Sequence, residues 1–184
     1  KMTVLTHAFT PGPIVASGPV KLTLMAPVAR FSLRLRAANI PAVSKAIGVD
    51  LAATVGARAA KGTTESICLG PDEWLIIAKP DDADTVTKAC ADVYASATHS
   101  LTEVSAREVT VRIEGERAAE LLTIGCPRDI DSIPVGGGCR TVIDGVTVVL
   151  WRDAEQSFRM DIWRSFALHI IDLLCTGCKE FAAE

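Results

Sequence analysis

Few residues in this chain have the types and spacing that metal chemistry requires. The nearest to a metal motif is Cys175-Thr-Gly-Cys178, two thiols at the C-x-x-C spacing found in zinc sites. A tetrahedral site needs two further ligands, and the three histidines, His7, His99 and His169, supply no second pair at ligand spacing. We therefore interpret Cys175 and Cys178 as thiols at a helix end. A metal completed by a partner protein is the alternative.

The second candidate for chemistry is the pair His169 and Asp172, which lie three residues apart on one predicted helix. Such a pair could act as a general base with the carboxylate that orients it. Two polar groups that hydrogen-bond each other within an apolar helix are a commoner arrangement. We favour this structural interpretation, in which neither residue is catalytic.

Nucleotide and phosphate sites are not indicated by the sequence. Neither G-x-G-x-x-G nor G-x-x-x-x-G-K-[ST] occurs, and the glycines at 136–138 precede a predicted strand, whereas phosphate loops lead into a helix. Arg34, Arg36 and Arg112 fall on the polar faces of two predicted strands, where charged side chains normally face solvent. We therefore predict no catalytic residue, no cofactor-binding residue and no metal site in this chain.

The helix that carries His169 and Asp172 follows directly on a predicted strand. Within residues 157–163, apolar residues alternate with Arg159, Asp161 and Trp163, which predicts a strand with one buried face. Ser165 can cap the helix, but apolar residues surround the helix axis, whereas a helix covering its own sheet should have a wide polar stripe. We expect one side of this helix to pack on the sheet and the other on a partner. The predicted partner interface consists of Trp163, Arg164, Phe166, Ile170 and Leu174.

The rest of the chain shows a repeated pattern of strands and helices. Phe31–Arg36 and Val109–Glu114 have the same alternation at an offset of 78 residues (109 − 31). Each predicted strand is followed by a helix, further strands and a second helix, with one strand more in the second unit. This order indicates an α+β fold of two ferredoxin-like halves with largely antiparallel sheets. We predict a single domain over residues 31–184, with pseudo-repeats at 31–106 and 107–178.

Residues 1–30 differ in composition from the predicted domain. They contain Pro11, Pro13, Pro19 and Pro27 together with two glycines, a density that excludes a long helix. The apolar residues of the same segment are too many for a solvated linker. We expect an extended N-terminal arm that lies along a surface, either of its own domain or of another subunit.

Two turn sequences carry conspicuous motifs, and we predict a structural role for both. Gly70–Glu73 predicts a β-turn leading into a buried Trp74, because Pro71 presets the first dihedral angle of the turn. Asp144–Gly145 predicts a tight hairpin between two strands.

Composition bounds the class of protein. The 184 residues are 49% hydrophobic and 22% charged with a net charge of −3, which indicates a folded chain and argues against a basic surface for nucleic acid or anionic membrane. A mean hydropathy of +0.30 is high for a chain that stays alone and favours a permanent partner. The first residues lack a signal peptide's apolar region, no segment approaches roughly 20 apolar residues, and the six cysteines fit reduced thiols. We therefore expect a cytoplasmic location.

Four segments, in order and spacing, resemble the gamma subunit of heterotetrameric sarcosine oxidase: Leu69–Ile76, Arg107–Asp129, Cys139–Arg152 and Ser157–Leu174. The resemblance implies an aminomethyltransferase-like fold and an accessory, non-catalytic subunit of a flavoenzyme that oxidatively demethylates sarcosine. Its partners would be alpha, beta and delta subunits. The resemblance further implies that FAD, FMN and NAD are held by alpha and beta, that zinc is associated with delta, that tetrahydrofolate accepts the one-carbon unit, and that this chain binds none of them.

Two alternatives to this role stay open at the level of sequence. A subunit of a related complex, such as N-methylglutamate dehydrogenase, would look alike in this chain. A free-standing folate-binding enzyme similar to the aminomethyltransferases is the other, and it would require an acidic catalytic residue and a folate pocket within this one chain.

Overall fold

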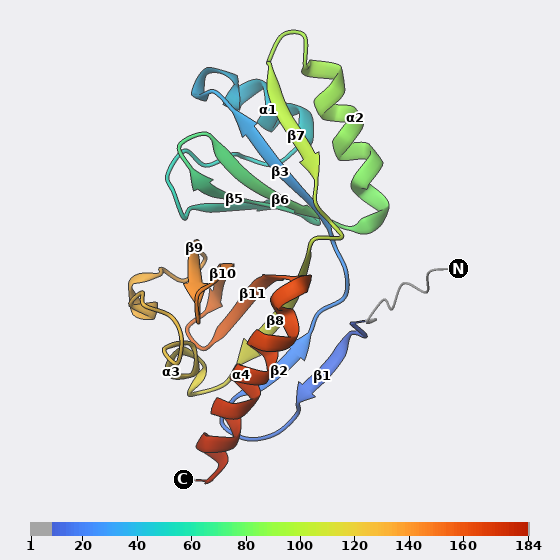
Figure 1. Ribbon diagram of the computed structural model, residues 1–184. Coiled ribbons are helices and arrows are strands. Elements are labelled where there is room, and N and C mark those ends of the chain that lie inside the picture. Colours follow the sequence, from blue (N-terminus) through green and yellow to red (C-terminus); the bar gives the residue numbers. More distant parts are fainter. Residues whose placement is uncertain (1–8, 184) are drawn as a thin grey trace, which may run out of the picture.

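The two strands predicted to be repeated lie at equivalent places in two separate antiparallel sheets. They are β3 (Ala29–Leu35) and β8 (Glu108–Glu114) of a computed structural model that describes residues 9–183. Each strand turns its alternating apolar side chains toward helices on the outer side of its sheet. The two sheets are stacked so that their other faces meet, with helices at both ends of the molecule (Figure 1).

The first sheet has the spatial order β4-β5-β6-β3-β7. Its other strands are β4 (Arg58–Lys61), β5 (Thr64–Gly70), β6 (Glu73–Ala78) and β7 (His99–Glu103). Helices α1 (Ile40–Ile47) and α2 (Ala83–Val93) pack on its outer face. Gly48 ends α1 in the left-handed conformation that glycine adopts without strain. We call this unit, residues 29–103, the first half.

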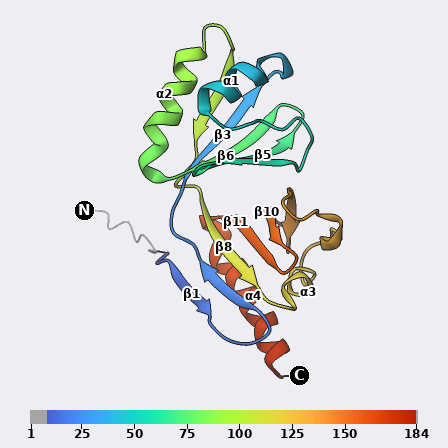
Figure 2. The same cartoon turned by 180° about the vertical axis from the view of Figure 1, so that it is seen from behind.

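The second sheet has the spatial order β1-β2-β8-β11-β10-β9. Its other strands are β1 (Gly12–Val15), β2 (Lys21–Leu24), β9 (Gly138–Ile143), β10 (Val146–Ala154) and β11 (Ser157–Trp163). Helices α3 (Ala118–Leu122) and α4 (Arg164–Ala183) cover its outer face. Figure 2 shows the two halves from behind. We call this unit, residues 12–24 and 108–183, the second half.

The two halves match element by element. The order β4-β5-β6-β3-β7 corresponds to β9-β10-β11-β8-β2, and α2 and α4 follow equivalent strands. The predicted α+β fold class with two ferredoxin-like halves is therefore confirmed. The prediction of one strand more in the second repeat is wrong, because β4 supplies the counterpart of β9. Strand β4 is short and half exposed, so its residues show no alternation of apolar and polar side chains.

Residues 12–24 of the predicted N-terminal arm, 1–30, are part of the second half, and residues 29–30 begin β3 of the first half. Residues 1–8 of the predicted arm lie outside the described residues. Strand β2 pairs with β8, and Val20, Leu22 and Leu24 are buried in the second core. Gly115 permits this approach, since a Cβ there would lie 2.1 Å from the Pro19 carbonyl oxygen. The prolines of this segment are compatible with the β1–β2 hairpin. Pro13 lies on an edge strand, where a missing N–H is tolerated.

Both predicted turns are confirmed. Trp74 is buried in the first core, and its indole Nε1 donates to the Ala52 carbonyl at 2.7 Å. Asp144 and Gly145 have φ angles of 46° and 77°, the left-handed values that a tight two-residue hairpin requires. Within residues 9–183, no helix combines the length and apolarity needed to cross a membrane.

Candidate subunit interface and the junction between the halves

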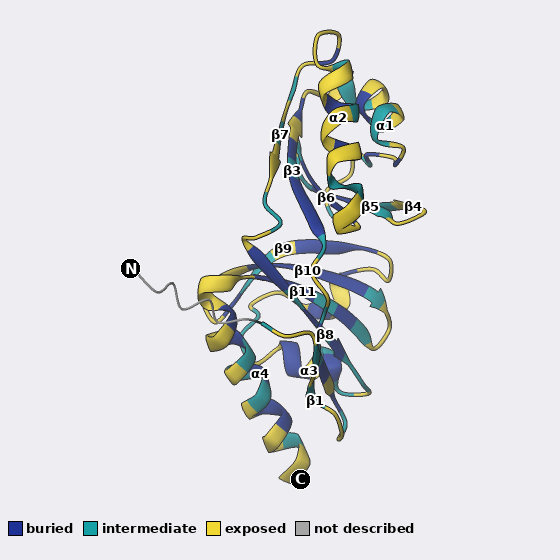
Figure 3. Cartoon of the chain, turned by 90° about the vertical axis from the view of Figure 1, so that its right-hand side faces the viewer, coloured by how far each residue is buried: buried dark blue, intermediate teal, exposed yellow. Residues whose placement is uncertain are grey.

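Exposed large apolar side chains gather where β11 passes into α4. Trp163 is 43% exposed, Phe166 46% and Leu168 54%. Arg164 is also exposed, and its guanidinium lies 5.0 Å from the centre of the Phe9 ring. We call these four residues, Trp163, Arg164, Phe166 and Leu168, the α4-start surface. Figure 3 shows exposed residues along one side of α4 and buried ones along the other.

Two residues of the predicted interface do not belong to this surface. Ile170 and Leu174 are 0% exposed and pack in the core of the second half, so grouping them with Phe166 was wrong. The buried stripe of α4 consists of Ala167, Ile170, Leu174, Gly177 and Cys178. Positions i and i+4 differ by about 40° around a helix. Phe166 is therefore rotated away from Ile170 and lies outside the buried stripe, which begins at Ala167.

Polar contacts hold both ends of this surface. The Arg107 guanidinium lies 5.3 Å from the Trp163 ring centre and donates to Glu108 at 2.7 Å. On α4, His169 Nε2 lies 2.8 Å from Asp144 Oδ2 in the β9–β10 turn. The predicted partner of His169 was Asp172, so this prediction is wrong, because the side chain extends toward the neighbouring turn. His169 and Asp144 are both exposed, so their contact is that of a surface pair.

The two cysteines of the C-x-x-C motif lie on α4. Burial raises the pKa of both the Cys175 and the Cys178 thiol, and Cys178 packs in the second core. Protonated thiols are poor metal ligands and weak nucleophiles. Among residues 9–183, no group of three or more His, Cys, Asp and Glu side chains could hold a metal ion.

The inner faces of the two sheets meet in an apolar contact. Ile67, Leu75 and Ile77 of the first half pack against Val149 and Trp151 of the second. We call this contact and the polar groups around it the junction. Because the junction covers the inner faces, β10 and β11 are buried on both sides.

A buried ion pair crosses the junction. Arg30 of the first half donates to Asp161 Oδ1 at 2.8 Å and also to Thr110 of the second half. Trp151 Nε1 donates to Asp161 Oδ2 at 2.7 Å, and Arg30 Nε lies 3.5 Å from Glu108 Oε2. All three charged residues are buried. Buried charges need this degree of pairing, because an unpaired one would carry a large desolvation cost.

A second set of charges flanks Trp151. Arg58 of the first half donates to Asp153 at 2.9 Å, and Arg159 of the second half donates to Glu65 of the first at 2.8 Å. The two guanidinium groups lie 4.8 and 4.9 Å from the Trp151 ring centre. Burial by itself would raise the pKa of Asp153, but the hydrogen bonds and charges of Arg159 and Arg58 outweigh it and lower that pKa. These contacts fix one orientation of the halves.

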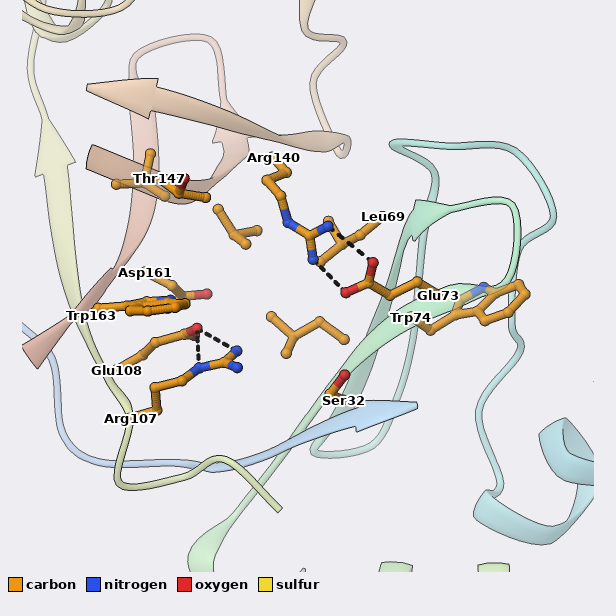
Figure 4. A pocket seen from close by; sticks show the side chains of 13 residues that line it. Ser32, Leu69, Glu73, Trp74, Arg107, Glu108, Arg140, Thr147, Asp161 and Trp163 are labelled. Carbon is orange, nitrogen blue, oxygen red and sulfur yellow. Dashed lines mark hydrogen bonds and ion pairs between the residues drawn. The ribbon is translucent and has the colours of Figure 1, made fainter. Parts of the chain in front are cut away.

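A small cavity lies at the edge of the junction, beside Trp163 (Figure 4). Its volume is about 120 Å³. Glu73 of the first half and Arg140 of the second form an ion pair across it, with Arg140 Nη1 donating to Glu73 Oε2 at 3.0 Å. Hydrogen bonding from Arg140 lowers the pKa of Glu73. The charged residues here are already paired with each other, and a drug-sized ligand occupies roughly 300–1,000 Å³. A cavity of this size has room for a few water molecules.

The comparisons with known proteins first define the fold. Aminomethyltransferase T of the glycine cleavage system from Bartonella henselae superposes with a TM-score of 0.67 at 14% identity, covering 85% of this chain and 45% of that one. At this identity the likeness shows the fold alone, and it confirms the predicted aminomethyltransferase-like architecture.

The particular family follows from closer matches. The model of the sarcosine oxidase, gamma subunit family matches residues 35–179. The sarcosine oxidase subunit gamma of Corynebacterium sp. (strain U-96) is 33% identical over 147 residues, 77% of this chain and 70% of that protein. A chain of the heterotetrameric sarcosine oxidase from Corynebacterium sp. U-96 superposes with a TM-score of 0.81 at 31% identity, covering 92% and 89% of the two chains. This chain therefore belongs to the sarcosine oxidase gamma subunit family, as the four sequence segments predicted.

Proposed function

We propose that this chain is an accessory, non-catalytic subunit of a heterotetrameric oxidoreductase that oxidatively demethylates sarcosine. The observation that carries the proposal is the match over residues 35–179 to the gamma subunit family, at a similarity that extends through both halves. Its partners are then an alpha, a beta and a delta subunit in the cytoplasm.

The character of the junction supports a structural role. Where the inner faces of the sheets meet, the space is filled by apolar packing and paired charges, and the cavity beside Trp163, at about 120 Å³, is smaller than the sites that hold drug-sized ligands, roughly 300–1,000 Å³. Glu73 lines this cavity, but Arg34 and Arg140 both hold its carboxylate, which disfavours a general base. We propose that FAD, FMN, NAD, tetrahydrofolate and zinc are bound by the partner subunits.

The α4-start surface is the proposed contact with a partner. Aromatic residues and Arg are enriched at protein interfaces, and Trp163, Phe166 and Arg164 are of these types. Permanent interfaces bury on the order of 2,000 Å² or more in total, so this surface would form only part of the contact.

The test is purification of the tagged chain from its native host, with mass spectrometry of the proteins that co-elute. We expect three further subunits in equal amounts, flavin absorbance, and oxidation of sarcosine by the assembly. The separately expressed chain should show neither flavin nor sarcosine turnover. An assembly that oxidises another N-methyl amino acid would place the chain in a related complex. Tetrahydrofolate binding by the chain alone would contradict the proposal.

A further inference from the structure

The two sheets differ at one edge, the edge formed by β7 in the first sheet and by β1 and β2 in the second. Strand β7 of the first half lies where β2 lies in the second half, and each pairs antiparallel with the repeated strand beside it. In the second half, β1 covers β2 as an additional antiparallel strand. In the first half, β7 ends the sheet within the described residues (Figure 1). Among residues 9–183, the first half therefore has no counterpart of β1.

The open side of β7 carries main-chain groups that can pair with another strand. Val104 N donates to the Arg30 carbonyl at 2.8 Å, and this bond fixes the phase of the β3–β7 ladder. Because hydrogen-bonded and non-hydrogen-bonded pairs alternate, Ser100 and Thr102 direct their N–H and C=O groups toward β3. Leu101 and Glu103 direct theirs away from it.

A groove accompanies this open edge. It has a volume of about 560 Å³ and runs between α2 and β7. Its walls are formed by Thr87, Cys90, Ala91 and Tyr94 of the helix side and by His99, Ser100 and Leu101 of the strand. The Tyr94 side chain is half exposed, and its ring meets the His99 ring edge-on at 5.5 Å between centres.

The equivalent place in the second half is filled by the chain itself. There β1 contacts α4, and Ile14 and Val15 pack against the second core. The second half thus shows what covers this position in the repeat: an extended antiparallel segment that places apolar side chains beside the helix.

The other sheet edges carry the features that discourage pairing with another strand. Strand β4 has Arg58 and Lys61, β1 has Pro13 and an irregular register, and β9 has Arg140. In β7 the only charged residue is Glu103, its last residue. An edge of regular register with a charge only at its end is a ready template for a further strand.

We propose that β7 accepts an extended segment of a partner subunit as a sixth, antiparallel strand. Main-chain hydrogen bonds to Leu101 and Glu103 would give the affinity, and an apolar side chain of the segment would enter the groove against Leu101 and Cys90. Such β-strand addition is a common mode of recognition. The proposal rests on the proposed function, because it takes the partner to be another subunit of the same complex.

The first test is hydrogen–deuterium exchange of the free chain and of the chain in the assembled complex, measured by mass spectrometry. We expect the outward amides of Leu101 and Glu103 to exchange fast in the free chain and at least tenfold more slowly in the complex, whereas Ser100 and Thr102, already bonded to β3, serve as the internal reference. Fast exchange in both states would overturn the strand addition while leaving the proposed function intact. Slow exchange in the free chain, or a dimer of the free chain, would assign β7 to an internal or self-paired contact. Failure to assemble would overturn both proposals.

A matched pair of variants isolates the backbone. Leu101→Ala and Leu101→Pro both remove the leucine side chain, but only Leu101→Pro removes the outward N–H. One hydrogen bond corresponds to about tenfold in affinity, so Leu101→Pro should bind the remaining subunits about tenfold more weakly than Leu101→Ala. Equal binding of the two variants, at equal unfolding temperature, would contradict a main-chain contact. If Leu101→Pro fails to fold, Thr102→Arg keeps the ladder and places a charge on the edge, and unchanged binding by that variant would overturn the proposal.

Discussion

The two halves share an order of strands and helices, but among the residues that the structure describes only the second half has a strand beyond the shared set. The second half gains the β1–β2 hairpin from the N-terminal segment and a helix of 20 residues, whereas the first half ends at β7 and has a helix of 11 residues in the equivalent place. The open edge of β7 lies where the repeat is broken, and the large apolar residues exposed at the start of α4 lie on the longer of the two equivalent helices. The repeated parts build the cores, and the departure at β7 supplies one of the surfaces available to a partner.

The largest loss of stability is expected from breaking the buried ion pair that joins the two halves. Asp161→Leu should lower the free energy of unfolding by about 3–5 kcal/mol, because Arg30 would then be buried without the carboxylate that accepts its hydrogen bond. The double variant Arg30→Met/Asp161→Leu removes both charges and should be much less destabilised. Urea unfolding measures both. A loss under about 1 kcal/mol in the single variant would show that the pair contributes little.

A slightly smaller effect tests whether the two cores unfold together. Trp74 and Met160 occupy equivalent places, opposite Leu33 in β3 and Val111 in β8. Trp74→Ala should cost about 3–5 kcal/mol and Met160→Ala about 2–5 kcal/mol. Because the junction couples the halves, each variant should unfold in a single transition by calorimetry. Two separate transitions would mean that the halves are independent domains, contrary to the predicted single domain.

The ion pair of Glu73 and Arg140 across the small cavity should make the free energy of unfolding depend moderately on pH. Arg140 lowers the pKa of Glu73, so this carboxylate stabilises the fold above its ordinary pKa, and the stabilisation is lost as pH falls through the lowered value. Glu73→Gln should therefore be less stable than the parent chain at neutral pH and should approach it below about pH 4. Unfolding free energies across this pH range provide the check, and parallel curves for the two proteins would exclude the effect.

A smaller stability change is expected at the turn that leads into Trp74. Asp72 is exposed and pairs with exposed Arg34 at 3.1 Å, an arrangement that contributes at most about 1 kcal/mol. Asp72→Asn should leave both stability and turnover of the assembled complex nearly unchanged. A hundredfold loss of turnover with intact assembly would assign this residue a catalytic part.

The sequence predicted those strands and turns whose geometry is specified by neighbouring residues. Examples are the alternation in β3 and β8, the Pro71 turn and the Asp144–Gly145 hairpin. The β1–β2 hairpin was not predicted from the sequence. Its strands are only four residues long, and its place is set by pairing with β8, which is distant in sequence.

The polar face of β11 shows a second limit of the sequence. Arg159 and Asp161 were placed on the polar face of a strand with one buried side, yet they lie in the junction. Alternation distinguishes two faces of a strand, but it does not distinguish water from a partner sheet lined with opposite charges. The side chains that cross the junction, Arg30 among them, therefore carried no recognisable signal. The interface prediction was right in placing Trp163 and Phe166 on a strand–helix corner, while their part in partner binding stays a prediction.

The most direct test of the account compares two charges placed four residues apart on α4. Phe166→Asp alters a side chain that is half exposed, whereas Ile170→Asp places a charge in the second core. We expect Phe166→Asp to abolish co-purification of the other subunits while the thermal unfolding of the free chain stays unaltered. Ile170→Asp should unfold the free chain, because the free-energy cost of burying an unpaired charge exceeds the free energy of unfolding of most domains. Undiminished co-purification by Phe166→Asp would contradict the assignment of the α4-start surface to a partner.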